Sequence, residues 1–258
     1  MKIVRTIAEL DLTGVVGLVP TMGALHDGHR SLFKVARAEN DVLVASLFVN
    51  PAQFDQQADL AAYPRDEERD VRIAEESGVD VLFAPAADEV YPAGFGTWID
   101  VADTGAEGTS RPGHFRGVAT VCVKLFNIVR PRRAYFGQKD AQQAAVLRRI
   151  VRDLNLDIEL RVLPTIRDKD GLAVSSRNVQ LSPEERMRAL ALPRALASGA
   201  ETYTQGGDPV AATLSSLNGL TADYVELVDL GAATVLAAAV RIGSTRLIDN
   251  VLLKGDLS

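Results

Sequence analysis

Two of the chain's three histidines lie three residues apart in the segment LVPTMGALHDGHRSL, residues 18–32. His26 and His29 flank Gly28, directly after an apolar run that ends in Pro-Thr-Met-Gly. Neutral imidazoles donate hydrogen bonds to phosphate oxygens without carrying a permanent charge. Gly23 and Gly28 permit a close approach of the backbone to a ligand. The pattern predicts a phosphate-binding turn between a strand and a helix; a capped loop with two surface histidines is the alternative.

Two further polar turns have side chains suited to phosphate. In GQKD, residues 137–140, Lys139 supplies a point charge and Asp140 can accept ribose hydroxyls or cap a helix. In VSSR, residues 174–177, two hydroxyls and a guanidinium follow the turn-prone RDKDG. The alternatives are a solvated surface lysine in the first case and an ordinary serine-rich loop in the second.

The elements that must position these turns alternate between apolar strands and amphipathic helices. Strands are expected over residues 15–21, 41–49, 79–85, 133–137 and 157–165, with helices between them at 29–40, 65–78, 116–131 and from about 140. Continuous apolar strands separated by helices favour a Rossmann-like, doubly wound parallel α/β sheet. Ligands of such sheets bind beyond the carboxyl ends of the strands.

The pattern changes after about residue 165. A helix capped by Ser182 and interrupted near Pro193, a short helix from Asp208, and three strand-like runs indicate a smaller α+β domain. We therefore expect a nucleotide-binding domain over residues 1–165 and a C-terminal lid domain over residues 166–258.

Composition excludes several classes of protein. A formal charge of −6 indicates no nucleic-acid-binding surface. No segment approaches the run of about 18 apolar residues that a membrane span needs. The N-terminus does not resemble a signal peptide, and the single cysteine, Cys122, is expected to be a reduced core residue. These features predict a cytoplasmic protein that binds neither nucleic acid nor membrane.

Six ordered segments resemble the pantothenate synthetase (pantoate–β-alanine ligase) family within the HxGH nucleotidyltransferase superfamily. They are VPTMGALHDGHRSL (19–32), FVNPAQF (48–54), YPRD (63–66), RPGHFRGVATVCVKLFNIVRP (111–131), AYFGQKDAQQ (134–143) and DGLAVSSRNVQLSPEER (170–186), and RIGSTRLIDN follows near the C-terminus. The family's usual glycine after NPxQF is replaced by Asp55, which puts the shape of that loop in question.

The resemblance implies an AMP-forming ligase with three substrates: ATP, (R)-pantoate and β-alanine. The pantoate carboxylate attacks the α-phosphorus of ATP, which gives pantoyl adenylate and pyrophosphate. The β-alanine amine then attacks the activated carbonyl and releases AMP. The resemblance also implies Mg²⁺ with the ATP and a homodimer, for which the strand-like residues 97–103 are a candidate contact.

The same resemblance assigns roles to residues of this sequence. Catalysis falls to His29, His26 and Lys139. ATP binding falls to Met22, Gly23, Ala24, Leu25, His26, Asp27, Gly28, His29, Gly137, Gln138, Lys139, Asp140, Ile166, Val174, Ser175, Ser176 and Arg177. Substrate binding falls to Gln53 and Gln143, with Asn50, Tyr63, His114 and Arg116 as secondary candidates, and Asp70 is the candidate metal ligand. The family pattern makes His29 a proton donor, but a carboxylate has no proton to lose, so we expect both histidines to act mainly as hydrogen-bond donors.

Two rival functions share some of these motifs. The first is a nucleotidyltransferase with a different acceptor, which would keep HxGH but does not require NPxQF or RPGHFRGVAT. The second is a nucleotide sensor without turnover, which needs glycine turns but not two imidazoles, Lys139 and SSR together. Pyrophosphate exchange that requires pantoate distinguishes the ligase from both.

Overall fold

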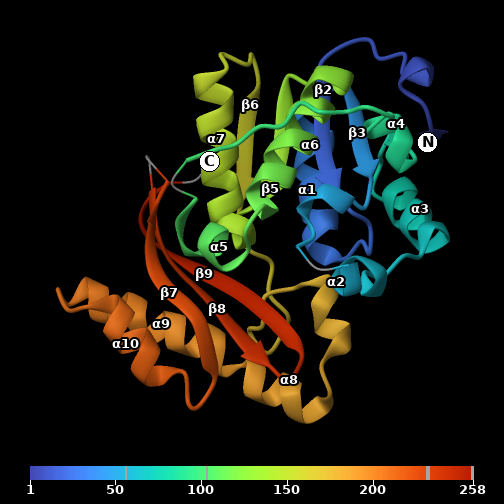
Figure 1. The fold of residues 1–258 in the computed structure, drawn as a ribbon. Coiled ribbons are helices and arrows are strands. Elements are labelled where there is room, and N and C mark those ends of the chain that lie inside the picture. The colour runs from blue at the N-terminus through green and yellow to red at the C-terminus, as the bar shows by residue number, and fades with distance from the viewer. Residues whose placement is uncertain (56, 103, 231–232, 257–258) are drawn as a thin grey trace. The chain divides into compact units, whose positions relative to one another are not determined.

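The computed structural model describes residues 1–55, 57–102, 104–230 and 233–256 (Figure 1). The chain forms two compact units. The first consists of Met1–Thr104, Arg111–Phe136 and Val146–Arg161, and the second of Gly105–Ser110, Gly137–Ala145 and Val162–Ser258.

A parallel sheet forms the centre of the first unit. Its strands are β1 (Lys2–Val4), β2 (Val16–Thr21), β3 (Val42–Leu47), β4 (Val81–Phe83), β5 (Arg133–Gly137) and β6 (Glu159–Leu163). Among the described residues, six strands follow the order β1-β4-β3-β2-β5-β6. In chain order, β2, β3 and β4 follow one another towards one edge of the sheet, and β5 and β6 follow one another towards the other edge. The topological switch point therefore lies between β2 and β5. This order confirms the predicted doubly wound α/β fold.

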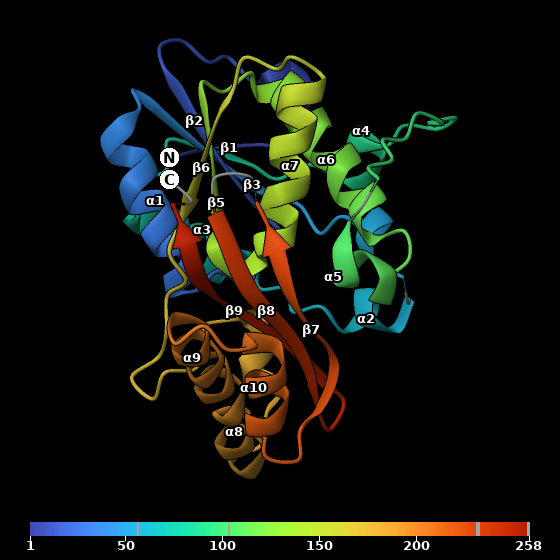
Figure 2. The same cartoon turned by 90° about the vertical axis from the view of Figure 1, so that its left-hand side faces the viewer.

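Helices cover both faces of this sheet (Figure 2). The helices of this part of the chain are α1 (Asp27–Glu39), α2 (Gln57–Ala62), α3 (Glu67–Glu76), α4 (Ala87–Val90), α6 (His114–Val129) and α7 (Ala141–Asp153), with 3-10 turns η1 (Ile7–Glu9) and η2 (Pro51–Gln53). Helix α1 lies on one face, and α6 and α7 lie on the other. The amphipathic spacing of each helix explains this arrangement, since each has one apolar face to bury.

The core of the first unit confirms the helical face predicted for residues 116–131. Six α6 side chains are 2–6% exposed: Val118, Val121, Cys122, Leu125, Phe126 and Val129. They pack against alternate residues of the strands, including Leu18 and Val44. Gly117 faces the turn η2 so closely that a Cβ atom would lie 2.2 Å from the carbonyl oxygen of Ala52. Glycine therefore lets α6 pack directly on the turn that carries Gln53.

The second unit is built on an antiparallel sheet, as predicted for a small α+β domain. Its described strands are β7 (Thr221–Asp229), β8 (Ala233–Ile242) and β9 (Thr245–Gly255), in that order. Its helices are α5 (Gly105–Ser110), α8 (Pro183–Ala189), α9 (Ala191–Thr204) and α10 (Pro209–Ser216), with 3-10 turns η3 (Gln138–Asp140) and η4 (Ser176–Gln180). One cluster joins apolar side chains of β8 and β9 to α8 and α9, and a second joins Val235 of β8 to Ala141 and Ala144.

The structure differs from the sequence-based expectations at strand β1, at the start of helix α1 and at residues 97–102, and it adds the short helices α2, α4 and α5. The sequence pattern does not predict strand β1, because three residues are too few to show a period. Helix α1 begins at Asp27 rather than near His29, because His26 itself caps the helix. Residues 97–102 form no strand, and Asp103 lies outside the described residues. Within the described ranges, no helix is both long and apolar enough to cross a membrane.

Candidate functional site

The two histidines sit at the junction of β2 and α1, and the backbone determines which ring nitrogen carries the proton. The N–H of Gly28 donates to Nδ1 of His26 (3.1 Å), and the N–H of His26 donates to Nδ1 of His29 (3.3 Å). The two rings are 4.2 Å apart between centroids. Because each Nδ1 accepts a hydrogen bond, the neutral ring carries its proton on Nε2. Both imidazoles therefore have the tautomer that donates through Nε2.

Gly28 is required for this arrangement because the ring of His26 folds back over it. A Cβ atom at position 28 would lie 2.8 Å from Cε1 and 2.9 Å from Nδ1 of His26. Any larger residue would therefore force the ring of His26 to move. The glycine between the histidines is thus explained by contact with a side chain.

Asp70, from α3, holds the segment that precedes the histidines. Its carboxylate is 2% exposed and accepts hydrogen bonds from the N–H of Ala24 (2.8 Å) and Leu25 (2.7 Å). Ala24 has a positive φ of 51°, and Gly23 approaches Asp70 so closely that a Cβ there would lie 2.8 Å from Oδ2. Burial raises the pKa of the Asp70 carboxyl, and the two backbone hydrogen bonds offset part of that rise. Asp70 therefore does not belong to the solvated face of α3.

These contacts bear on the magnesium ligand assigned to Asp70. Both carboxylate oxygens already accept backbone hydrogen bonds, and the side chain is almost fully buried. Within the described residues, no group of three or more His, Cys, Asp or Glu side chains is arranged to hold a metal ion. Magnesium in nucleotide sites is bound by one or two carboxylates together with substrate phosphates. The carboxylate of Asp70 thus contacts the backbone before the histidines, and its assignment to Mg²⁺ stays a prediction.

The rest of the predicted ATP segment in the first unit follows the same turn. Gly23, Ala24 and Leu25 are buried, Met22 is partly exposed, and Asp27 is an exposed residue in the first turn of α1. The loop after β2 thus supplies backbone groups and the two imidazoles at the N-terminus of a thirteen-residue helix. The partial positive charge of such a terminus favours a bound anion.

Gln53 lies in the turn η2, and its side chain is fixed by Asn50. The amide nitrogen of Asn50, which is 1% exposed, donates to Oε1 of Gln53 (3.0 Å) and to the carbonyl oxygen of Gly117 (3.1 Å). The Asn50 oxygen accepts from Tyr91 Oη (2.9 Å) and the N–H of Ala52 (3.2 Å). Since Asn50 occupies the Gln53 oxygen, the Gln53 amide is oriented before any ligand binds.

Three secondary candidates have structural contacts near the same turn. Nδ1 of His114 lies 2.9 Å from the carbonyl oxygen of Gln53, and Tyr63 packs edge-on against Phe54. Arg116 lies over the ring of Trp98 and 3.5 Å from Asp100. These contacts favour a supporting role for His114 and assign no ligand to Tyr63 or Arg116.

Lys139 belongs to the second unit, in the 3-10 turn η3 between Gly137 and helix α7. Its side chain is 20% exposed, and its Nζ lies 3.8 Å from the carboxylate of the more exposed Asp140. Gln138 donates from Nε2 to Oδ1 of Asn250 in β9 (3.0 Å). Gln143, assigned to the substrate, lies one turn further along α7 and is partly exposed. The η3 turn therefore carries the positively charged Lys139 and is hydrogen-bonded to strand β9.

The VSSR segment forms the start of the capped 3-10 turn η4, beside strand β9. Ser175 caps η4, accepting the N–H of Arg177 at its hydroxyl (3.3 Å) and the N–H of Asn178 at its carbonyl (3.0 Å). Val174 donates its N–H to the carbonyl of Ile166 (2.9 Å), so these two predicted residues pair through their backbones. Ser176 begins η4 and is partly exposed.

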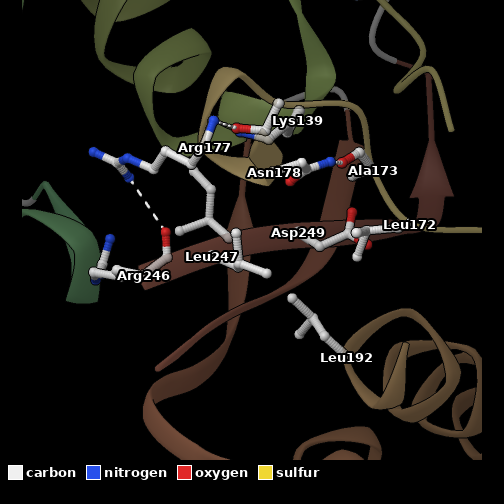
Figure 3. A pocket seen from close by; sticks show the side chains of 11 residues that line it. Lys139, Leu172, Ala173, Arg177, Asn178, Leu192, Arg246, Leu247 and Asp249 are labelled. Carbon is white, nitrogen blue, oxygen red and sulfur yellow. Dashed lines mark hydrogen bonds between the residues drawn. The ribbon is translucent and has the colours of Figure 1, made fainter. Parts of the chain in front are cut away.

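A pocket of the second unit brings Lys139 together with two predicted residues of the VSSR turn (Figure 3). It is lined by Lys139, Leu172, Ala173, Ser175, Arg177, Asn178, Leu192, Arg246, Leu247, Ile248 and Asp249. The buried Oδ1 of Asn178 has no hydrogen-bond partner among the described residues. The enclosed volume is only about 10 Å³, room for about one water molecule. A nucleotide held by these side chains therefore extends outside the pocket.

The predicted residues thus fall into two clusters. The first unit holds the histidine turn, Asp70 and Gln53, and the second holds the Lys139 turn, Gln143, Ile166 and residues 174–177. Sequence reasoning missed Asn50 as the residue that fixes Gln53, and it missed Asp249 and Asn250. The only signal for the last two was the RIGSTRLIDN segment, whose residue types indicate no chemistry by themselves.

Comparison with known proteins identifies the family. The Pantoate-beta-alanine ligase family model matches residues 2–252. The chain is 51% identical to the pantothenate synthetase of Roseiflexus sp. strain RS-1, over 98% of this chain and 100% of that protein. The crystal structure of pantothenate synthetase from Thermus thermophilus matches with a TM-score of 0.92 and 46% identity, over 98% of this chain and 99% of that one.

A second solved structure carries ligands. The pantoate-beta-alanine ligase of Francisella tularensis, complexed with beta-gamma ATP and β-alanine, is 36% identical and matches over 100% of both chains with a TM-score of 0.84. The family model and the relatives cover nearly all of the present sequence, including both units. On this evidence the chain belongs to the pantoate–β-alanine ligase family.

Proposed function

We propose that this protein condenses (R)-pantoate with β-alanine at the expense of ATP. A pantoate carboxylate oxygen attacks the α-phosphorus of ATP, and the bond to the bridging oxygen breaks, which releases pyrophosphate and leaves pantoyl adenylate. The amine of β-alanine then attacks the acyl carbon, loses a proton, and expels AMP to give pantothenate. Family membership over the whole chain supports this reaction.

The observation that carries the assignment to this site is the histidine turn. Both Nδ1 atoms accept backbone N–H groups, so both rings have the tautomer that donates through Nε2. Negative charge increases on the phosphate oxygens during adenylation, and preorganised donors stabilise such charge. We assign His26 and His29 to the reacting phosphate as hydrogen-bond donors, with His29 the more important. Neither residue needs to exchange a proton with the carboxylate.

The second unit supplies the permanent positive charge. We assign Lys139 and Arg177 to the phosphates of ATP, with Ser175 and Ser176 as hydroxyl donors. The charged side chains of Lys139 and Arg177 line the same pocket, which supports this assignment. The remaining ATP contacts predicted in the second unit are Gly137, Gln138, Asp140, Val174 and Ile166. Ile166 is assigned to ATP through its backbone.

Gln53 and Gln143 are the proposed pantoate ligands, and Gln53 also faces β-alanine. An amide offers one acceptor and two donors, which suits a molecule with both hydroxyls and a carboxylate. The hydrogen bond from Asn50 to Gln53 Oε1 supports this role, since it leaves the Gln53 N–H₂ group to orient towards a substrate oxygen.

Three further assignments complete the proposal. Mg²⁺ enters with ATP and is held mainly by phosphates, with Asp70 as the predicted protein ligand. The protein acts as a homodimer in the cytoplasm.

Isotope exchange between pyrophosphate and ATP tests the proposed reaction. We expect exchange that depends on (R)-pantoate and Mg²⁺ and needs no β-alanine, because adenylation is the first and reversible step. Addition of β-alanine should then yield AMP and pantothenate in equal amounts. Exchange supported only by another acceptor would instead indicate a different nucleotidyltransferase, and ATP binding without exchange would indicate a sensor.

A further inference from the structure

Asn250, in the RIGSTRLIDN segment of β9, contacts the turn that carries Lys139. Its side chain is 2% exposed. The amide nitrogen donates to the carbonyl oxygens of Gln138 (2.8 Å) and Lys139 (3.0 Å), and the amide oxygen accepts from Nε2 of Gln138 (3.0 Å). One buried side chain therefore makes three hydrogen bonds to two consecutive residues of η3.

Asp249 fixes Asn250 in turn. The N–H of Asn250 donates to Oδ1 of Asp249 (2.8 Å), and Arg167 donates to both carboxylate oxygens of Asp249 (3.0 and 2.7 Å). Arg167 also donates to the carbonyl oxygen of Asn250 (3.3 Å). Asp249 is 2% exposed, and a carboxylate buried so deeply is stable only when it is paired in this way.

The other end of this network reaches the VSSR turn. Arg167 pairs with Ala173 in an isolated β-bridge and follows Ile166, whose carbonyl accepts the N–H of Val174. Asn178 donates from Nδ2 to the carbonyl of Ala173 (3.0 Å). A continuous set of hydrogen bonds thus links the backbone of Lys139, through β9, to the segment that leads into Ser175 and Arg177.

We propose that Asn250 is a positioning residue for adenylation, and that it acts through Lys139. A lysine stem is flexible, so its ammonium is preorganised only if the backbone that carries it is fixed. Asn250 fixes that backbone at two carbonyl groups, and the Asp249–Arg167 pair fixes Asn250. This inference rests on the proposed function, because Asn250 is proposed to position Lys139 and the proposed function assigns Lys139 to the phosphates of ATP.

A double-mutant cycle with Lys139 tests the proposal, with pantoate-dependent pyrophosphate exchange as the readout. Asn250→Ala should lower kcat for exchange by about 10- to 100-fold in the wild-type background, the size of effect expected from displacing a catalytic group by about 1 Å. In a Lys139→Ala background the same substitution should change the rate by no more than about twofold, since the group it positions is gone. A purely structural role predicts equal losses in both backgrounds and would overturn the proposal.

Two further variants separate positioning from stability. Val251→Ala, at the next position in β9, removes core packing without touching η3, and its exchange rate should stay within about twofold of wild type. Asn250→Asp keeps the shape but turns an acceptor towards the two carbonyl oxygens, so it should lose at least as much activity as Asn250→Ala. Circular dichroism and thermal unfolding establish the fold of each variant. Failure of both Asn250 variants to fold assigns the residue to stability alone and also overturns the proposal, whereas absence of exchange in the wild type overturns the proposed function itself.

Discussion

At the scale of single residues, the histidine turn makes a prediction about His29. His29→Ala removes a preorganised donor and should lower the rate of pantoate-dependent exchange by about 10²–10³, the usual cost of losing one such group. His29→Asn is the matched variant, because its amide can still accept the N–H of His26 that Nδ1 accepts in the wild type. Both variants should be slow, while His29→Asn should unfold at a higher temperature than His29→Ala. An exchange rate within about threefold of wild type for either would contradict the role of a transition-state donor.

Gly28 makes a second prediction at this scale. Gly28→Ala places a Cβ atom within 2.9 Å of the His26 ring and should displace it, lowering exchange by about 10- to 100-fold. Gly96→Ala is the control, because its Cβ would meet no atom closer than 3.9 Å and its φ is not positive. That variant should keep the wild-type rate. Equal rates for the two variants would show that the contact between Gly28 and the ring is unimportant.

The residues that were predictable from the sequence are those whose own chemistry is distinctive. His26, His29, Lys139 and Arg177 could be selected because imidazole, ammonium and guanidinium groups near glycines suit phosphate. Asn250 could not, because it acts through backbone carbonyls that only the folded structure brings to it.

At the scale of elements, helix α3 makes a prediction through Asp70. Burial raises the pKa of this carboxyl in the folded protein above its unfolded value of about 3.9. The folded state therefore binds more protons than the unfolded state between those two pKa values, and the free energy of unfolding falls as pH rises through that window. Asp70→Asn removes this titration, so its stability relative to wild type should increase as pH rises.

Urea unfolding at a series of pH values measures this difference. The same variant should also lose adenylation activity. In the wild type, the N–H groups of Ala24 and Leu25 each donate to one oxygen of the Asp70 carboxylate. Asp70→Asn replaces one of these oxygens with an N–H₂ group, which cannot accept a hydrogen bond from either N–H. A relative stability that stays constant across pH would show that Asp70 has the same pKa in both states. Unchanged exchange would show that the segment before the histidines does not depend on Asp70.

Helix α6 makes a prediction about Cys122. Its thiol is 4% exposed within the core of the first unit, and burial raises its pKa to about 12. Because the thiolate is the reactive form, native protein should react with a disulfide reagent at least about 100-fold more slowly near pH 8 than protein unfolded in guanidinium chloride. Absorbance of the released thiolate measures both rates. Fast labelling of native protein would show that α6 does not stay packed on the sheet.

Helices and strands could be predicted where apolar residues recur at a regular spacing along the chain. The α6 face and the continuous apolar strands follow from burial on one or both sides. Strand β1 is too short to show a period, and the capping of α1 by His26 depends on a side chain that forms no standard cap. Local patterns thus predicted strands β2 to β6 and helices α1, α3, α6 and α7. They did not predict β1, α2, α4 or the residue at which α1 begins.

At the scale of the whole molecule, the chain forms two compact units. The sequence indicated this division through the change of pattern near residue 165. It did not indicate that residues 105–110 and 137–145 group with the C-terminal sheet. Those assignments depend on contacts such as Asn250 with η3, between positions far apart in the chain.

The two half-reactions provide the last prediction, because they place different demands on the phosphate contacts. Pyrophosphate has already left when β-alanine attacks, so residues that hold its charge should matter most in the first step. Lys139→Ala and Arg177→Ala should therefore slow pantoate-dependent exchange by about 10²-fold or more. When pantoyl adenylate is supplied directly, the release of AMP by β-alanine should fall by about tenfold or less in the same variants. Rapid-quench assays of the two steps compare these losses, and equal losses would assign both cations to the adenylate itself.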